Sequence, residues 1–326
     1  MENNKKKELK QSNEKYQLQI TLQIHKKSVM NIIILKDLRL ASSSCDKSIK
    51  IFNKDTYEIE INILEHTDFV AYIYQLKDEK LISSSSDNTI KIFKLFKNSY
   101  NIEQILKGHS KPVKKTIELI NGDLVSCSWD KTIKIWNKNN KNNLYTISFK
   151  IDDKLEIYSI YEINDKEFFS ISCTEDDDDR TITFYKKNNN GYDIIGFIDN
   201  ISISGFQSNS VKINDKYFLI GGKDKIYFIN IITYKIDKIC ELKKELWIQS
   251  LYLLSNGNLI TGNTIGLIIY KIIDNNLELI YDLKNDDDND DEYNYNKLIS
   301  SIQEDLNKNI IISSYTGKIK VFSKIK

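Results

Sequence analysis

The sequence predicts an all-β fold made of seven repeated units, and three observations carry that prediction. Three segments are close copies of one another, each with a Ser-rich apolar stretch, an Asp and then alternating Ile and Lys: 38–52, 79–93 and 122–136. Four weaker copies follow at 168–185, 217–229, 258–270 and 309–322. The alternation has the period of two that is typical of β-strands. Units of this kind and number indicate four-stranded blades, so we expect a seven-bladed β-propeller.

The spacing of the units supports the same fold. The first isoleucine of the presumed third strand serves as a register mark: Ile49, Ile90, Ile133, Ile182, Ile226, Ile268 and Ile319. Consecutive marks lie 41 to 51 residues apart, a length that suits four strands and their turns. The acidic runs 175–179 and 286–292 lengthen the two largest gaps. They lack the spaced ligands and central Gly of an EF-hand loop, so solvated insertions are favoured over calcium sites.

Composition excludes several classes of protein. The 326 residues include 47 Lys and Arg against 46 Asp and Glu, a net charge of +1, which argues against a broad nucleic-acid-binding surface. No segment approaches the ~18 apolar residues of a membrane helix, and the first 15 residues do not resemble a secretory signal. No two of the four cysteines have CxxC spacing (Cys45, Cys127, Cys173 and Cys240). We therefore expect a cytoplasmic protein, with a nuclear location as the alternative.

The three histidines of the chain occupy matching places in the first three units. Each lies 21 residues before an Asp, in the pairs His25–Asp46, His66–Asp87 and His109–Asp130. Each Asp lies 6 residues before an aromatic residue: Phe52, Phe93 and Trp136. Partly buried imidazoles and carboxylates must find polar partners. The regular spacing therefore favours a structural role, in which each pair locks a turn to a strand, over a metal site or a general base.

With these motifs in place, the sequence resembles the WD-repeat propeller family. The family's Gly-His corresponds to Gly108-His109, its turn Asp to Asp130 and its closing Trp to Trp136, whereas the Asp after that Trp is replaced by Asn137. The resemblance is strong over 24–136 and weaker over 155–322. It implies a hydrogen-bonded tetrad of His, a strand Ser or Thr, Asp and Trp within one blade. Only the first three blades can build it, so we expect apolar packing to hold the other four.

The end of the chain suggests how the ring closes. The last unit provides three strands, and near the N-terminus four apolar residues alternate with polar ones: Tyr16, Leu18, Ile20 and Leu22. The resemblance implies that this N-terminal strand becomes the outer strand of the last blade, which covers an exposed sheet edge. Residues 1–15 are polar and charged and are expected to form a disordered tail before a propeller that spans 16–326.

The resemblance also indicates a binding face. In the family, the residues just before the turn Asp and just before the first strand point onto the face where the channel opens and where partners commonly dock. Aromatic residues stand at four such places: Phe69, Trp129, Trp247 and Tyr315. Exposed aromatic residues are typical interface anchors, so we hypothesise a shared protein-docking surface, with Asp130 aiming the Trp129 ring outward. The alternative is that Phe69 and Trp247 plug the channel.

The function that these observations favour is a non-catalytic scaffold or adaptor that binds other proteins or peptides. No catalytic, cofactor or metal site is predicted, the Ser-rich strands lack a GxSxG elbow, and no small-molecule substrate, nucleic acid or membrane is expected. The alternatives are a fixed subunit of a cytoskeletal, ciliary, trafficking or RNA-processing complex, or a substrate receptor of a ubiquitin ligase. The two arginines, Arg39 and Arg180, fall in turns on opposite faces, which disfavours a receptor that clasps phosphate.

Overall fold

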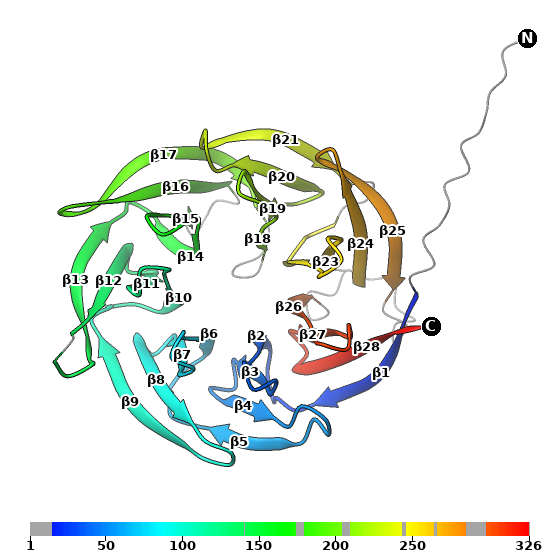
Figure 1. Ribbon diagram of the computed structural model, residues 1–326, viewed down its shortest axis with the longest axis horizontal. Helices are drawn as coiled ribbons and strands as arrows, with labels where there is room; N and C mark the ends of the chain where they lie inside the picture. Colours follow the sequence, from blue (N-terminus) through cyan, green and yellow to red (C-terminus); the bar gives the residue numbers. More distant parts are fainter. Residues whose placement is uncertain are drawn as a thin grey trace, which may run out of the picture.

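The chain forms a ring of seven β-sheets. The computed structural model describes residues 15–139, 141–173, 179–203, 209–242, 246–263, 266–284 and 298–325. These residues form 28 strands in seven four-stranded antiparallel sheets, and they contain no helix. The described part of the chain accordingly has no helix that could cross a membrane. The predicted seven-bladed β-propeller is confirmed (Figure 1).

The first four blades take their strands in chain order, from the channel outward. Blade 1 contains β2 (Val29–Ile34), β3 (Leu40–Ser44), β4 (Ile49–Phe52) and β5 (Ile59–Ile63). Blade 2 contains β6 (Val70–Gln75), β7 (Leu81–Ser85), β8 (Thr89–Leu95) and β9 (Tyr100–Lys107). Blade 3 contains β10 (Val113–Glu118), β11 (Leu124–Ser128), β12 (Thr132–Lys138) and β13 (Tyr145–Asp152). Blade 4 contains β14 (Glu156–Glu162), β15 (Glu167–Cys173), β16 (Asp179–Asn188) and β17 (Gly191–Ser202).

The last three blades complete the ring. Blade 5 contains β18 (Ser210–Lys212), β19 (Tyr217–Gly221), β20 (Lys225–Asn230) and β21 (Lys235–Glu241). Blade 6 contains β22 (Ser250–Leu253), β23 (Leu259–Asn263), β24 (Gly266–Ile273) and β25 (Asn276–Lys284). Blade 7 contains β26 (Ile299–Glu304), β27 (Ile310–Ser314), β28 (Lys318–Ile325) and the N-terminal β1 (Lys15–Gln23). The first strand of each blade lies nearest the central channel (Figure 1).

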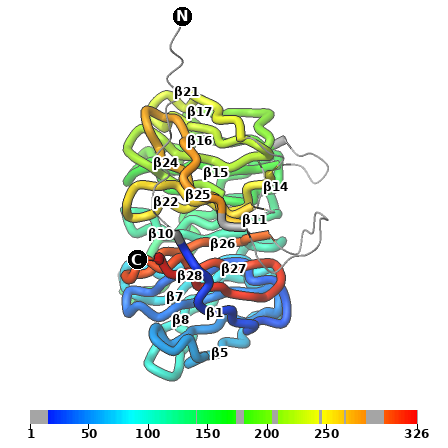
Figure 2. The backbone as a smooth tube through the Cα atoms, turned by 90° about the vertical axis from the view of Figure 1, so that its right-hand side faces the viewer, coloured from blue at the N-terminus to red at the C-terminus, as the bar shows by residue number. Residues whose placement is uncertain are grey.

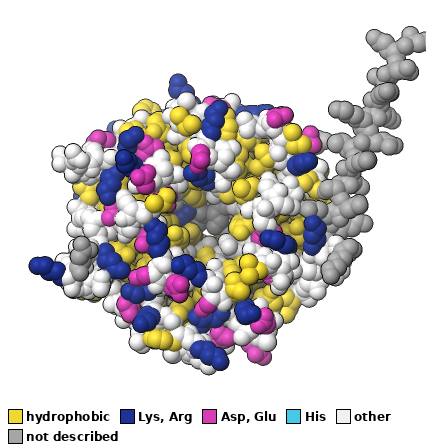
Figure 3. Space-filling view, viewed as in Figure 1, with side chains coloured by type: hydrophobic (Ala, Val, Ile, Leu, Met, Phe, Trp, Pro, Cys, Tyr) yellow, Lys and Arg dark blue, Asp and Glu magenta, His cyan; other side chains and the backbone are white. Residues whose placement is uncertain are grey.

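The hydrophobic core is divided among the seven seams between blades. Each of seven buried clusters takes its side chains from two neighbouring blades, and none is confined to a single blade. At the seam of blades 1 and 2, for example, Ile51 and Ile63 pack with Ile73 and Phe93. The surface is charged but mixed: Figure 3 shows acidic and basic side chains interspersed around the central hollow, in keeping with the net charge of +1.

Polar contacts reinforce four of these seams. They lie at the edge of the ring that carries the turns between the first and second strands of the blades. In each, a backbone N–H in that joint donates to a side chain at the end of the next blade's first strand. The pairs are Lys36 with Gln75 (2.8 Å), Lys77 with Glu118 (2.6 Å), Ile120 with Glu162, and Ser255 with Glu304 (2.7 Å). These bonds satisfy turn donors and connect each blade to its neighbour.

The register differs from the sequence expectation in blade 6. Ile49 pairs with Ser43, and the residue that holds the same place in blade 6 is Leu267, which pairs with Gly262. Ile268 therefore lies one residue beyond the position that the register mark was meant to identify. It is equivalent to Lys50 of blade 1, the residue after Ile49. The expectation relied on isoleucine alone, although leucine fills a buried strand position equally well.

The ring closes through β1 and β28. Eight residues of β1 pair with β28 in antiparallel register, from Lys15 with Ile325 to Gln23 with Lys318. The two strands also lie side by side in both backbone views (Figures 1 and 2). A register shift between Leu18 and Ile20 breaks the expected alternation, because a bulge moves the following residues to the other face. Tyr16 is therefore buried in the seam of blades 6 and 7, whereas Ile20 and Leu22 pack at the seam of blades 7 and 1. Leu18, before the bulge, is 45% exposed.

Deletion of residues 1–23 should destabilise the propeller strongly. It removes the hydrogen bonds of β1 and the packing of Tyr16, Ile20 and Leu22. Tyr16 is fully buried, while Ile20 and Leu22 are partly buried. At about 1.5–3 kcal/mol for a fully buried side chain and less for the other two, the loss is comparable to the lower end of typical domain stability, about 5–15 kcal/mol. Thermal melts should show a much lower Tm or aggregation, while deletion of residues 1–14, which lie outside the described residues, should leave Tm nearly unchanged. Equal Tm values for the two deletions would contradict closure by β1.

Candidate functional site

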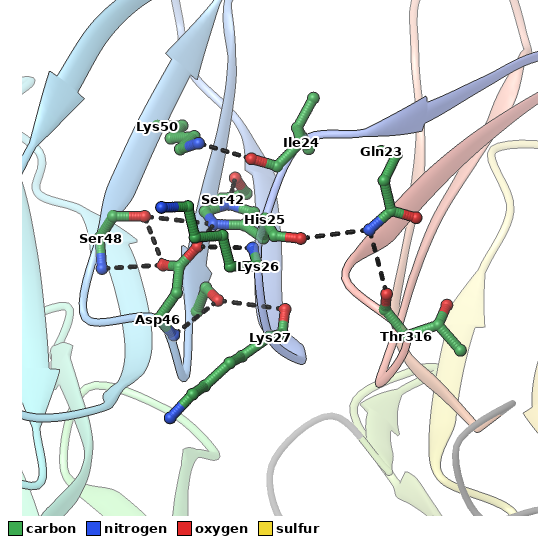
Figure 4. Close-up of polar contacts among 11 residues, drawn as sticks. Gln23, Ile24, His25, Lys26, Lys27, Ser42, Asp46, Ser48, Lys50 and Thr316 are labelled. Atoms are coloured by element: carbon green, nitrogen blue, oxygen red, sulfur yellow. Dashed lines mark hydrogen bonds and ion pairs between the residues drawn. The ribbon is translucent and has the colours of Figure 1, made fainter.

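The histidine of blade 1 lies at the centre of a polar lock (Figure 4). His25 is 2% exposed; its Nδ1 lies 2.9 Å from Asp46 Oδ2 and its Nε2 lies 2.7 Å from Ser42 Oγ. Asp46 also accepts a hydrogen bond from the backbone N–H of Lys26 (3.0 Å), and its second oxygen accepts one from the Ser48 hydroxyl (2.5 Å). One carboxylate therefore fixes the imidazole, the segment before β2 and the turn before β4.

Blades 2 and 3 repeat this arrangement. In blade 2, His66 lies 2.7 Å from both Asp87 Oδ2 and Ser83 Oγ. In blade 3, His109 lies 2.8 Å from Asp130 Oδ2 and from Ser126 Oγ. Only blade 3 adds a fourth member, because the Trp136 Nε1–H donates to Ser126 Oγ at 2.8 Å. Phe52 and Phe93 are buried at the equivalent place and have no polar atom to donate.

Close packing around Gly108 accounts for the single Gly-His pair. A Cβ atom on Gly108 would lie 2.7 Å from Ile147 Cδ1 and 3.3 Å from the Trp136 ring, so only glycine fits without a shift of those side chains. Blades 1 and 2 carry the smaller phenyl ring and accommodate Ile24 and Glu65 before their histidines. The glycine of the Gly-His motif is thus required by close packing against Ile147 first and the Trp136 ring second.

The locks shift the proton affinities of their members. Burial alone would raise the pKa of the Asp46, Asp87 and Asp130 carboxyls, but the hydrogen bonds from the histidine and the neighbouring hydroxyl outweigh it. Each carboxyl pKa is therefore held well below its usual range. For His109, burial lowers the pKa and outweighs the opposing effect of Asp130. The native state thus favours a charged Asp130 and a neutral His109.

Substitution of Asp130 by Ala should destabilise the protein by about 1–3 kcal/mol, the usual cost of an orphaned buried polar group. It leaves His109, Thr132 and the backbone N–H of Ser110 without their acceptor. Asp215→Ala is the matched control, because the Asp215 side chain is fully exposed and pairs only with the surface amine of Lys212. Urea unfolding curves that show equal stability for the two variants would contradict a structural role for the lock.

The pH dependence of stability follows from the same shifts. Stability should decline as pH falls below about 6.5, because unfolded His109 then binds a proton that the native site disfavours. It should fall further below about pH 4, where the unfolded aspartates take up protons that their folded counterparts resist. Asp130→Asn should be less stable at pH 7 but lose less between pH 4 and pH 2. Parallel curves of unfolding free energy against pH for variant and wild type would contradict this linkage.

Blades 4 and 5, which lack histidine, use aromatic side chains instead. In blade 4, Tyr185 takes the place of Trp136, and its hydroxyl lies 3.2 Å from Ser170 Oγ, which occupies the place of Ser126. At the seam of blades 4 and 5, Phe169 packs with Tyr161 and Phe218, each ring centroid at 5.1 Å. These contacts agree with the expectation that apolar packing holds the later blades.

Sequence reasoning left the strand hydroxyls of the locks unassigned. Each serine lies 17 residues after its histidine, in the pairs His25–Ser42, His66–Ser83 and His109–Ser126. That constant offset is visible in the sequence and could have identified them. The amines of Lys50 and Lys91 were also missed; they donate to the carbonyls just before the first two histidines.

The four aromatic residues of the hypothesised docking surface lie at one edge of the ring, in the loops and turns that precede first and third strands. Phe69 is the most accessible at 40% exposure, and its carbonyl accepts the Ser86 N–H (2.8 Å), which fixes its backbone. Trp129, Trp247 and Tyr315 are half-buried. Burial raises the pKa of the Tyr315 hydroxyl to about 12.

Trp129 does not point outward as expected. Its ring packs against Tyr158 (centroids 5.6 Å apart), and the Lys114 ammonium lies 4.3 Å from the ring centroid. The indole Nε1 is buried. The Asp130 lock fixes the backbone of the turn, but the side chain of the neighbouring blade decides where the ring lies. Trp129 is thus partly a packing residue at the seam of blades 3 and 4.

Two further expectations concern the acidic runs and the arginines. The run 286–292 lies outside the described residues, as does 175–178. Arg180 lies within β16, not in a turn, and its guanidinium packs on Tyr158 at 4.8 Å. Arg39 lies in the β2–β3 turn at the other edge of the ring, where it pairs with Asp37. Among the described residues, no group of three or more His, Cys, Asp or Glu side chains is arranged to hold a metal ion.

The ring of seven four-stranded blades defines a β-propeller, and its first three blades carry the His–Asp–Ser contacts that the resemblance to WD repeats implied. Residues 16–53 and 101–137 match the family model described as WD domain, G-beta repeat. Among solved structures, the chain is similar to the WD40 β-propeller domain of Doa1, with a TM-score of 0.72 and 20% identity over 95% of this chain and 98% of that one. Two segments of the chain thus match WD repeats, and the chain as a whole has the fold of a WD40 propeller. No curated protein matches its sequence.

Proposed function

We propose that this propeller is an adaptor that binds protein or peptide partners on the ring edge that carries Phe69, Trp129, Trp247 and Tyr315. WD-repeat propellers generally serve as protein-interaction scaffolds, and this proposal assigns the binding face. The observation that carries it is Phe69, an aromatic side chain that is 40% exposed on a backbone fixed by a hydrogen bond. Large aromatic residues held in this way are typical anchors of protein interfaces, because they bury much area with little loss of conformational entropy.

The chain provides a closely matched control for Phe69. Phe96 is 41% exposed and has the Lys94 ammonium 5.6 Å from its ring, as Phe69 has Lys27 at 5.4 Å. Phe96 lies in the β8–β9 turn, at the opposite edge of the ring. The two residues therefore have the same chemistry and exposure and differ in the face that they occupy.

Phe69→Ala should weaken partner binding, whereas Phe96→Ala should not. Each variant should keep its unfolding free energy within about 0.5 kcal/mol of wild type, as surface substitutions usually do. Proteins captured from cell extract by the purified chain and quantified by mass spectrometry should decrease at least severalfold for Phe69→Ala only. Trp129→Ala is a poorer probe, because the ring packs on Tyr158. Equal capture by both variants, or a selective loss with Phe96→Ala, would place the binding face elsewhere.

A further inference from the structure

A cleft of about 600 Å³ opens at the outer rim of the ring, between β5 of blade 1 and the start of β9 in blade 2. These two strands are the outermost strands of their sheets, and they follow one another around the rim (Figure 1). The cleft has the size of a typical ligand site, and its lining is mostly polar. None of the four aromatic residues of the hypothesised docking surface lines it, so it is a separate site.

The equivalent place at the seam of blades 2 and 3 is closed by a side-chain amide. Gln104 of β9 donates from Nε2 to the Tyr145 carbonyl (2.7 Å), and its Oε1 accepts the Tyr145 N–H (2.8 Å). Tyr145 begins β13. A residue of an added antiparallel strand exchanges the same two bonds through its own N–H and C=O. The Gln104 amide is thus an internal copy of strand addition at this rim.

Blade 1 lacks this amide. Ile61 of β5 holds the place of Gln104, and Tyr100 of β9 holds the place of Tyr145. The strand pairs correspond: Ile51–Ile61 to Ile92–Gln104, and Leu95–Tyr100 to Lys138–Tyr145. A hydrocarbon side chain cannot form the two bonds, and Ile61 is instead buried in the seam of blades 1 and 2. The cleft lies where the amide is missing.

The main-chain groups of Tyr100 point away from β8. The Phe96 N–H donates to the Ser99 carbonyl (2.8 Å), so those two residues form a hydrogen-bonded pair. Such pairs alternate with non-hydrogen-bonded ones along an antiparallel ladder. The next residue, Tyr100, therefore directs its N–H and C=O to the open side of β9, as Tyr145 does in β13. Tyr100 lines the cleft, and an edge of this kind is a template for another strand.

The next two seams fill the same place with packed side chains. Between blades 3 and 4, Phe149 holds the place of Gln104, and a Cβ atom on Gly191 would collide with its ring. Between blades 4 and 5, the place belongs to Gly196, where a Cβ atom would lie 3.0 Å from the Tyr234 Cβ. The chain itself thus occupies at these seams the space that forms a cleft between blades 1 and 2.

We propose that this cleft binds an extended peptide segment of a partner, one residue of which pairs through its N–H and C=O with Tyr100 as the Gln104 amide pairs with Tyr145. The segment adds as a short strand at the start of β9, beside β5. Main-chain hydrogen bonds supply affinity in this mode of recognition, and the neighbouring side chains supply specificity. The site does not depend on the docking surface around Phe69.

The lining favours a neutral or basic segment over an acidic one. Glu60 and Glu65 line the cleft, and no Lys, Arg or His does. The cations nearby are engaged with the chain: Arg39 lies 3.6 Å from Glu60, and Lys91, which is 8% exposed, donates to the Glu65 carbonyl. The Glu65 carboxylate accepts a hydrogen bond from the neutral Tyr100 hydroxyl (2.8 Å). An acidic side chain in the segment therefore meets like charges, which disfavour it.

The proposal is tested by nuclear magnetic resonance on the full-length chain labelled with nitrogen-15 at its tyrosines. The amide signal of Tyr100 is the one that Tyr100→Phe removes. The probes are the capped peptide Thr-Val-Thr-Lys-Thr-Val-Thr, its counterpart with Glu in place of Lys, and the Lys peptide with its three central amides N-methylated. We expect the Lys peptide to shift the Tyr100 signal, the Glu peptide to bind at least threefold more weakly at low salt, and the N-methylated peptide to cause no shift. The Tyr145 amide, which Gln104 already binds, is the internal control and should not move.

Three substitutions locate the site. Ile61→Gln supplies the amide that closes the next seam, so the Lys peptide should no longer shift the Tyr100 signal. Glu65→Gln removes one carboxylate and should narrow the difference between the Lys and Glu peptides at least twofold. It keeps the test decisive if Ile61→Gln fails to fold. Glu103→Gln is the matched control, because Glu103 lies on the same strand outside the cleft and pairs with Lys80 (3.0 Å); it should change neither affinity.

Other results would overturn the proposal. An unmoved Tyr100 signal at millimolar Lys peptide, or an equal shift with the N-methylated peptide, would contradict strand addition. Equal shifts at Tyr100 and Tyr145 would overturn the assignment to the cleft. A Glu peptide that binds as tightly as the Lys peptide would overturn the charge preference. Phe69→Ala should leave the titration unchanged, and a loss of the shift in that variant would place the peptide on the docking surface instead.

Discussion

A four-stranded blade can bury both of its faces only against the blades beside it, and the rest of this structure depends on that constraint. All seven buried clusters span two blades. A missing or misplaced blade would therefore expose two apolar faces and not one. Closure by β1 completes blade 7, so that this blade too has its full set of strands. The family repeat that matches 16–53 begins on this outer strand of blade 7 and continues into blade 1. The repeat of the sequence is thus offset by one strand from the blade, and this offset ties the two chain ends together.

The seven blades solve the packing problem in two ways. Blades 1 to 3 place a charged Asp and a buried His near the proposed docking edge, which fixes the turns that carry Cys45, Ser86 and Trp129. Blades 4 and 5 use aromatic rings at their seam: Phe169 stacks on Tyr161 of its own blade and meets Phe218 of blade 5 edge to face. Polar locks define geometry more sharply than apolar contacts do, because hydrogen bonds are directional. The best-defined part of the proposed docking edge is therefore the part nearest Phe69, where both the backbone and the neighbouring lock are fixed.

The repeat, the number of blades, the His–Asp spacing and the N-terminal closing strand could all be predicted, since each leaves a periodic trace in the sequence. What could not be predicted depends on contacts between blades. The Trp129 ring lies where Tyr158 of the next blade places it, and Glu118 caps a turn of the preceding blade. Ile20 and Leu22 face a different seam from Tyr16 because of a bulge, which shifts the face of a strand without changing its alternating composition. Period-two patterns report strand identity, but they do not report which neighbour a side chain meets.

Closure of the ring by β1 is the central claim, and native-state hydrogen exchange measures it most directly. β1 and β13 are both outer strands, each bonded to one neighbouring strand, and they differ in that β1 comes from the other end of the chain. If β1 is an integral strand of a cooperative ring, its amides that bond to β28 will exchange with the same opening free energy as the amides of β13 that bond to β12. That free energy will be close to the free energy of global unfolding. Exchange of the β1 amides at a much lower opening free energy, while β28 and β13 stay protected, would contradict the claim and show that the ring is stable with blade 7 left open.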